Sequence, residues 1–245
     1  MRIPDRRAAG LPVILLAVVA AVSSALLLGA LWGLYGRLGD RTEGFVLAMG
    51  GGALMLAAVL ELIVPAQRAT SFEATAAAVL AGAAVFAGID YLIDERWGDE
   101  GGAGLLAAVT LDGVPENLAL GVALIGAGFP EVAALAASIF LSNLPEAAGG
   151  AKRMREQGWP DGRILALWTG TAVLLGAAAM VGNLLLLDAP ADVLAPIRAF
   201  AGGAVIASLA TEIFPKAFRR DHHMAGVATA LGFLGALALI GGTDA

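Results

Sequence analysis

Long apolar runs separated by short polar breaks dominate the pattern of hydrophobic and polar positions along this chain. The runs are about 20 residues long, the length of a helix that crosses a lipid bilayer. Their positions predict eight helices, at residues 11–35, 44–65, 72–94, 103–127, 131–151, 163–187, 193–215 and 224–241. We therefore predict an all-α membrane protein with eight transmembrane helices that form one domain over residues 1–245.

The composition strengthens this prediction, because 59% of the residues are hydrophobic and only 15% are charged. Inside a bilayer every backbone polar group must be satisfied internally, which leaves helical bundles and closed barrels. The strands of a barrel would alternate over about 10 residues, and the runs here are longer. The absence of cysteine excludes disulfides and thiolate metal ligands. No basic cluster is interleaved with aromatic residues, so we expect no nucleic-acid partner.

Basic residues are unevenly distributed between the two sets of predicted loops. The first, third, fifth and seventh loops hold ten of the 15, namely Arg37, Arg41, Arg96, Lys152, Arg153, Arg155, Arg163, Lys216, Arg219 and Arg220. The positive-inside rule places these loops in the cytoplasm, although the N-terminal arginines favour the opposite orientation. We expect a multi-pass membrane protein with both termini outside the cytoplasm.

The second and seventh predicted helices resemble each other. Gly51-Gly52-Ala53 precedes Glu61, and Gly202-Gly203-Ala204 precedes Glu212, with ten residues from the first glycine to the glutamate in both. Under the predicted topology these two helices cross the membrane in opposite senses, as in the inverted repeats of transporters. The pattern predicts a 3+2+3 inverted-repeat bundle, with three helices on either side of a central pair.

The central pair carries a Pro-Glu core twice, in Asp112-Gly113-Val114-Pro115-Glu116 and in Ser142-Asn143-Leu144-Pro145-Glu146. Each proline frees the carbonyl four residues before it, because its ring nitrogen has no hydrogen to donate. The first and last residues of each motif are four apart and share one helix face. We therefore expect oxygen ligands to converge between these two helices.

Acidic residues recur inside the predicted spans, where we expect no Lys or Arg to pair with them: Glu61, Asp90, Asp112, Glu116, Glu146 and Glu212. A charged carboxylate at the membrane centre costs about 3 kcal/mol on insertion scales. Several such groups must be protonated or must meet a cation supplied from solution. The sequence therefore predicts a metal ion or a proton as the guest.

These motifs resemble those of the ZIP family (Zrt/Irt-like zinc and iron permeases), whose fourth and fifth helices carry His-Asn-x-Pro-Glu-Gly and a related Pro-Glu core. The resemblance covers essentially the whole chain. It implies a transporter of a bacterial inner membrane, with both termini in the periplasm. Such a transporter moves a divalent metal ion (zinc, iron or manganese) into the cytoplasm by alternating access, without an organic cofactor. The resemblance also implies that Glu116 and Glu146 bridge two metals, that Asp112 and Ser142 are the first ligands on their helices, and that Asn143 belongs to a second site.

Three departures from the family pattern keep an alternative open. Asp112 and Ser142 replace imidazole or amide ligands, Gly113 replaces an asparagine, and the sixth predicted helix offers no acidic ligand. The alternative is a protein of this fold that has lost one metal site and transports another solute or senses metal. We expect no enzyme, because the motifs of intramembrane proteases and the His-Glu-x-x-His motif are missing.

Four further residues are candidates for a gate or an ion pathway. Glu61 and Glu212 would lie near opposite membrane faces, Asp90 would lead the ion toward the cytoplasm, and Met55 would offer a thioether. The competing interpretations are snorkelling or solvated carboxylates and a lipid-facing methionine. For Glu116 and Glu146 the competing interpretation is a hydrogen-bonded pair of neutral acids. The expected partners are membrane lipid and metal ions, and a homodimer is one option for the assembly.

Overall fold

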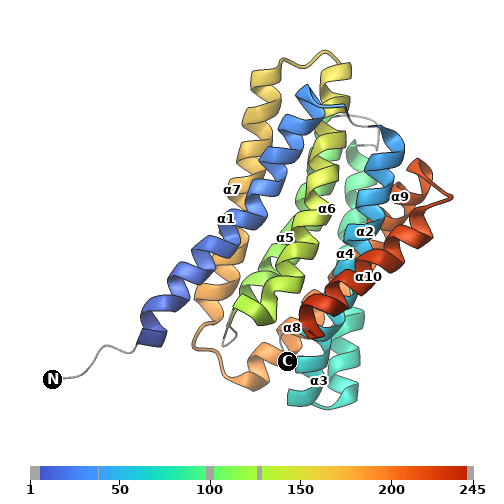
Figure 1. Ribbon diagram of the computed structural model, residues 1–245. Coiled ribbons are helices and arrows are strands. Elements are labelled where there is room, and N and C mark those ends of the chain that lie inside the picture. The colour runs from blue at the N-terminus through green and yellow to red at the C-terminus, as the bar shows by residue number, and fades with distance from the viewer. Residues whose placement is uncertain (1–5, 38, 98–101, 126–128, 242–245) are drawn as a thin grey trace.

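The computed structural model describes residues 6–37, 39–97, 102–125 and 129–241. Every regular element in these ranges is helical, which confirms the predicted all-α class. The helices lie side by side in an elongated bundle (Figure 1). The beginning of the first helix and the end of the last helix lie toward the same end of this bundle.

The elements of the described ranges are, in chain order, α1 (Arg6–Tyr35), α2 (Asp40–Ala58), the π-helical turn η1 (Val59–Ile63), α3 (Val64–Ala69), α4 (Phe72–Trp97), α5 (Gly102–Ala123), α6 (Phe129–Glu156), α7 (Asp161–Leu186), α8 (Ala191–Ser208), the π-helical turn η2 (Leu209–Ile213), α9 (Phe214–Arg220) and α10 (Ala225–Gly241). The segment α2–η1–α3 is one uninterrupted helical segment, and so is α8–η2–α9. The predicted end of the fourth span, residue 127, lies outside the described residues.

Six helical segments of the described chain are long and apolar enough to cross a bilayer: Val13–Tyr35, Asp40–Ala69, Phe72–Leu92, Val132–Glu156, Asp161–Leu186 and Ala191–Arg220. The helix α10 is apolar but shorter, with 17 residues. Large apolar side chains such as Leu80, Val173 and Leu185 are exposed on the outside of the bundle. A surface of this kind requires an apolar solvent, so the helices indicate a multi-pass membrane protein.

Glycines let several helices approach each other backbone to backbone. A Cβ on any of four glycines would overlap a carbonyl of the helix that it crosses: Gly52 with Thr229 and Gly232 with Met49 where α2 crosses α10, and Gly203 with Val79 and Gly82 with Phe200 where α8 crosses α4. Small residues permit such close packing in membranes, where dispersion contacts between helices replace the hydrophobic effect. The two crossings therefore use glycines at corresponding positions, because Gly52 and Gly203 are each the second glycine of the motif that α2 and α8 share.

The central helices α5 and α6 each pack along one further long helix. The helix α1 lies along α6, where Gly29 and Gly33 meet the backbone of α6. The helix α7 lies along α5, where Gly121 and Gly182 meet the backbone of the neighbouring helix. The pairs α1–α6 and α7–α5 thus bring the outer helices onto the two helices that carry the Pro-Glu cores.

The predicted spans 44–65 and 193–215 end too early, because the helical segments continue past Pro65 and Pro215 to Ala69 and Arg220. Each proline is the second residue of the α-helix that follows a π-helical turn. A proline in the first turn of a helix needs no N–H donor, and the wider π turn accommodates its ring. The assignment of Lys216 to a loop is therefore wrong, since this residue lies within the helical segment.

Candidate cation-binding site

Three carboxylates are buried in the interior of the bundle, on the two helices that carry the Pro-Glu cores. Asp112 and Glu116 on α5 are each 2% exposed, and Glu146 on α6 is 6% exposed. Both helices continue without interruption through Pro115 and Pro145. Glu146 is within electrostatic range of both carboxylates of α5. The structure thus brings together the acidic residues of both motifs.

Each of these carboxylates keeps an oxygen that has no hydrogen bond within the described residues. These oxygens are Oδ2 of Asp112, Oε1 of Glu116 and Oε1 of Glu146, and the last of them has the ammonium of Lys216 at 3.7 Å, beyond hydrogen-bond distance. Leaving a buried polar atom without a partner costs about 1–3 kcal/mol, and more for a charged group. A cation that coordinates these oxygens would offset that cost, which makes them candidate ligands.

Two polar residues of the second Pro-Glu motif, Ser142 and Asn143, are buried on α6 together with Glu146. The hydroxyl of Ser142 donates to the carbonyl of Ile139 at 3.1 Å, a bond along its own helix. Such back-bonding is common for serine in membrane helices, and it leaves the oxygen lone pairs available for a ligand role. Asn143 is 3% exposed. Ser142 and Asn143 precede Glu146 by four and three residues, and both are buried. Their role as ligands stays a prediction.

The carbonyl that Pro145 frees is covered by a neighbouring helix. A Cβ on Gly50 of α2 would lie 3.0 Å from the oxygen of Leu141 and 2.7 Å from the nitrogen of Ser142. The backbone of α2 therefore packs directly on this carbonyl. A side chain larger than glycine at position 50 would not fit against it.

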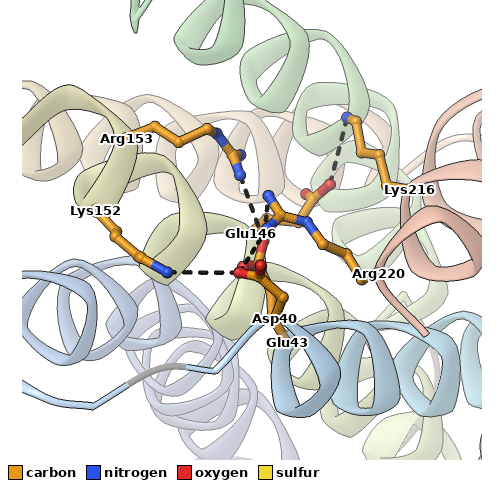
Figure 2. Close-up of polar contacts among 7 residues, drawn as sticks. All are labelled: Asp40, Glu43, Glu146, Lys152, Arg153, Lys216 and Arg220. Carbon is orange, nitrogen blue, oxygen red and sulfur yellow. Dashed lines mark hydrogen bonds and ion pairs between the residues drawn. The ribbon is translucent and has the colours of Figure 1, made fainter. Parts of the chain in front are cut away.

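Lys216 is a charged residue of the candidate site that the sequence analysis did not single out. Its Nζ lies 3.7 Å from Oε1 of Glu146 (Figure 2). Lys216 also forms an ion pair with Glu212, four residues earlier. The side chain is 18% exposed. The expectation that the acidic residues have no basic partner is therefore wrong, because the helix continues beyond Pro215 and carries the lysine inward. The spacing of Glu212 and Lys216 was the signal that could have revealed the pair.

Ser208 is a second residue that the sequence did not single out. Its hydroxyl donates to Oδ1 of Asp112 at 3.0 Å, and it is fully buried. The bond joins α8 to α5 and holds the carboxyl of Asp112 in place. Because Ser208 precedes Glu212 by four residues, Ser208, Glu212 and Lys216 reach the same cluster from the α8–η2–α9 segment.

A network of ion pairs lies next to the carboxylate cluster and joins α2, α6 and α9 (Figure 2). Glu43, 4% exposed, lies 3.5 Å from Arg153 and 3.4 Å from Arg220. The more exposed Asp40 lies 3.5 Å from Lys152 and 3.0 Å from Arg220. Because Arg220 contacts both acids, it is the link between the two halves of the network.

A cavity of about 160 Å³ connects this network with the carboxylate cluster. Its lining combines acidic and basic side chains from three helical segments: Glu43, Leu47, Glu146, Arg153, Lys216, Arg219 and Arg220. The basic members belong to the set of residues that the positive-inside rule assigns to the cytoplasm. The cavity thus gives access to Glu146 from the end of the bundle that we expect to face the cytoplasm.

The gate and pathway candidates lie in different places. Glu212 is buried in η2 and belongs to the central cluster through Lys216. Glu61 lies in η1, half-buried and within electrostatic range of Arg198. Asp90 is half-buried on α4, and Met55 is 39% exposed on α2, which agrees with a lipid-facing side chain. The helices that follow the two π turns, α3 and α9, lie toward opposite ends of the bundle (Figure 1).

The central cluster is not a preformed coordination sphere. Among the residues that the structure describes, no three His, Asp or Glu side chains are close enough together to hold a metal ion. The two histidines, His222 and His223, follow α9 and are exposed. A bound ion would therefore require the carboxylates to draw closer around it, with oxygen atoms as the donors.

Comparison with known proteins does not identify a family for this chain. No protein-family model matches the chain, and a search of the curated proteins finds no match either. The buried charges and their neighbours are therefore the basis for any statement about function.

Proposed function

We propose that this protein is a divalent cation transporter of a bacterial inner membrane, similar to the ZIP family, that moves its ion toward the cytoplasm. One observation carries the proposal: Asp112, Glu116 and Glu146 are buried in an apolar bundle, and each has an oxygen that accepts no hydrogen bond within the described residues. Together with Glu212 they make four carboxylates, and Lys216 brings one positive charge. Such a cluster favours a cation from solution, because uncompensated charge is expensive at bilayer depth.

We infer that the helices span the membrane eight times, as three, two and three. The matching glycine crossings of α2 with α10 and of α8 with α4 support this arrangement. The matching pairs α1–α6 and α7–α5 support it as well. The two π-helical turns, each with a glutamate and each followed by a proline, are the third argument. Under this arrangement α5 and α6 are the central pair, and the ion binds at the repeat interface.

The chemistry of the donors favours hard cations. Carboxylates of Asp112, Glu116 and Glu146, the hydroxyl of Ser142 and the amide of Asn143 all offer oxygen. Oxygen donors suit Mn²⁺, Fe²⁺ and Mg²⁺ relatively better than imidazole or thiolate donors do, while the general affinity order of divalent metals still favours Zn²⁺ over Mn²⁺. We therefore propose a transporter with a flat preference among zinc, iron and manganese.

Release toward the cytoplasm follows the cavity that begins at Glu146. An ion that leaves the carboxylate cluster would pass Glu43, which lines the same cavity. The arginines and Lys216 on the cavity wall repel a cation, so release requires the helical segment α8–η2–α9 to shift relative to α6. A rigid shift of outer helices against a central pair is the usual form of alternating access.

A specific observation favours a second candidate function. Lys216 occupies the carboxylate cluster as an internal cation, and no group of three ligands is assembled within the described residues. Both features suit a protein of this fold that has lost one metal site and senses metal or transports another solute. Such a protein would bind a divalent ion without moving it across the membrane.

Uptake into proteoliposomes tests the two candidates. The purified protein is reconstituted, and accumulation of Zn²⁺, Mn²⁺, Fe²⁺ and Mg²⁺ is measured against vesicles that contain Glu146→Gln. Uptake that depends on Glu146 supports the transporter. Stabilisation by metal in a thermal unfolding assay, without uptake of any of the four ions, supports the sensor instead and contradicts the transporter.

A further inference from the structure

We propose that the ammonium group of Lys216 occupies one of two adjacent cation positions, so that the protein holds one divalent ion and not a pair. The inference rests on the proposed function, since it concerns the same carboxylate cluster. It assigns the position between Glu146 and Glu212 to Lys216 and leaves the position at Asp112 and Glu116 to the transported ion.

The position of Lys216 between two acidic residues is the first argument. Its ammonium pairs with Glu146 on α6 and with Glu212 on η2, so it joins two helical segments as a bridging metal would. An ammonium is a compact point charge, and three donors let it serve several carboxylates at once. The place of a cation between these two acids is therefore already taken.

The free oxygens of the cluster are the second argument. Oδ1 of Asp112 accepts the hydrogen bond of Ser208, whereas Oδ2 has no hydrogen bond, and neither has Oε1 of Glu116. Both residues are 2% exposed and lie one helical turn apart on α5. These two oxygens without hydrogen bonds lie on α5, a helix that contributes no residue to the ion pairs of Lys216, and they define where a single divalent ion would bind.

Charge balance is the third argument. The four carboxylates can offset at most four positive charges, and Lys216 with one divalent ion supplies three. A second divalent ion between Glu146 and Glu212 would lie at the position of the ammonium, and repulsion between these cations in a medium of low dielectric constant would exclude it. The lysine therefore sets the number of ions that bind.

The matching helix shows that the lysine is particular to one half of the bundle. The residue four positions after Glu212 is Lys216, and the residue four positions after Glu61 is Pro65. Glu61 instead lies within range of Arg198, whose guanidinium is held by the carbonyls of Val122 and Ile125. The internal cation at the cluster is thus a feature of the α8–η2–α9 segment.

The absence of cysteine from the chain permits a direct test. Full-length Lys216→Cys is capped with 2-aminoethyl methanethiosulfonate, which restores an ammonium, or with methyl methanethiosulfonate, which leaves a neutral group. Each reagent forms a mixed disulfide with the thiol and releases methanesulfinate. The cavity that Lys216 lines gives the reagents access. Bound Mn²⁺ per chain is then measured in nanodiscs by equilibrium dialysis and mass spectrometry.

The expected result is about one ion per chain for the wild type and the ammonium-capped variant, and about two for the neutral-capped variant. Lys152→Cys is the matched control, because the sequence has no third lysine and Lys152 pairs with the exposed Asp40. It should bind one ion with either cap. One ion in both capped forms of Lys216→Cys, or two in the wild type, would overturn the inference while the proposed function stands. A wild type that binds no ion would overturn both.

Discussion

The carboxylate of Glu43 on α2 lies directly on the backbone of Gly149 on α6, so that a Cβ on this glycine would overlap Oε1 and Cδ of the glutamate. Gly149 follows Glu146 by three residues and lies on nearly the same face of α6. The buried ion-pair network and the carboxylate cluster therefore meet on a single turn of one helix. A displacement of Glu43 would affect both.

Gly149→Ala tests this relationship. The added methyl group should displace Glu43 from its contacts with Arg153 and Arg220 and leave a buried charge with poorer partners. We expect a loss of roughly 1–3 kcal/mol in the free energy of unfolding, because buried charged groups lose that much when a partner is removed. The measurement is the thermal unfolding temperature of the purified protein in nanodiscs.

Gly170→Ala is the control for that substitution. Gly170 lies in the helix α7, and nothing is within 4 Å of a Cβ built there. Alanine favours a helix over glycine by about 0.5–1 kcal/mol, so this variant should be as stable as the wild type or slightly more stable. Equal destabilisation by both substitutions would show that the contact between Glu43 and Gly149 has no particular importance.

Glu116→Gln and Glu146→Gln should each remove most metal uptake while the protein remains folded and inserted. An amide relieves the burial cost of the carboxylate but lacks the charge that holds the ion. Uptake is measured in proteoliposomes, with Asp192→Asn as the matched control, since Asp192 is exposed in the first turn of α8. Near-normal uptake by either glutamine variant is the result that would exclude the central site.

Asp112→His should shift the ion preference toward zinc. Asp112 is an oxygen donor where the ZIP family has nitrogen, and an imidazole ligand suits Zn²⁺ better than Mn²⁺. Competitive uptake of Zn²⁺ against Mn²⁺ by the wild type and the variant in the same vesicles gives the ratio. Strong rejection of Mn²⁺ by the wild type, or an unchanged ratio in the variant, would mean that Asp112 does not determine selectivity.

Both termini should lie in the periplasm. The first residues of α1 and the last residues of α10 lie toward the same end of the bundle, away from the end where α6 finishes (Figure 1), and the last turns of α6 carry Lys152 and Arg153. Basic residues favour the cytoplasmic side. A C-terminal alkaline phosphatase fusion, which is active only in the periplasm, should be active, and a fluorescent protein that matures only in the cytoplasm should stay dark. The reverse pattern would contradict the topology.

The helical class and the acidic character of the centre followed from the sequence by itself. Apolar runs of membrane-spanning length leave the backbone only helices, because lipid offers no hydrogen-bond partners. The two Pro-Glu cores likewise identified Asp112, Glu116 and Glu146 as the residues to find buried. These features depend on short-range pattern and on the solvent, so no knowledge of the packing was needed.

The tertiary structure alone decided which charges meet. Lys216 and Glu146 are 70 residues apart, and Ser208 and Asp112 are 96 apart. The contact of Lys216 depends on a π-helical turn that carries the helix through Pro215, which a pattern of hydrophobic residues does not encode. Loop and helix readings of the residues after Pro215 were equally consistent with the sequence. Only the packing of α9 on α2, which in turn lies along α6, brought Lys216 to Glu146, because residues this far apart in the chain meet only when their helices pack together.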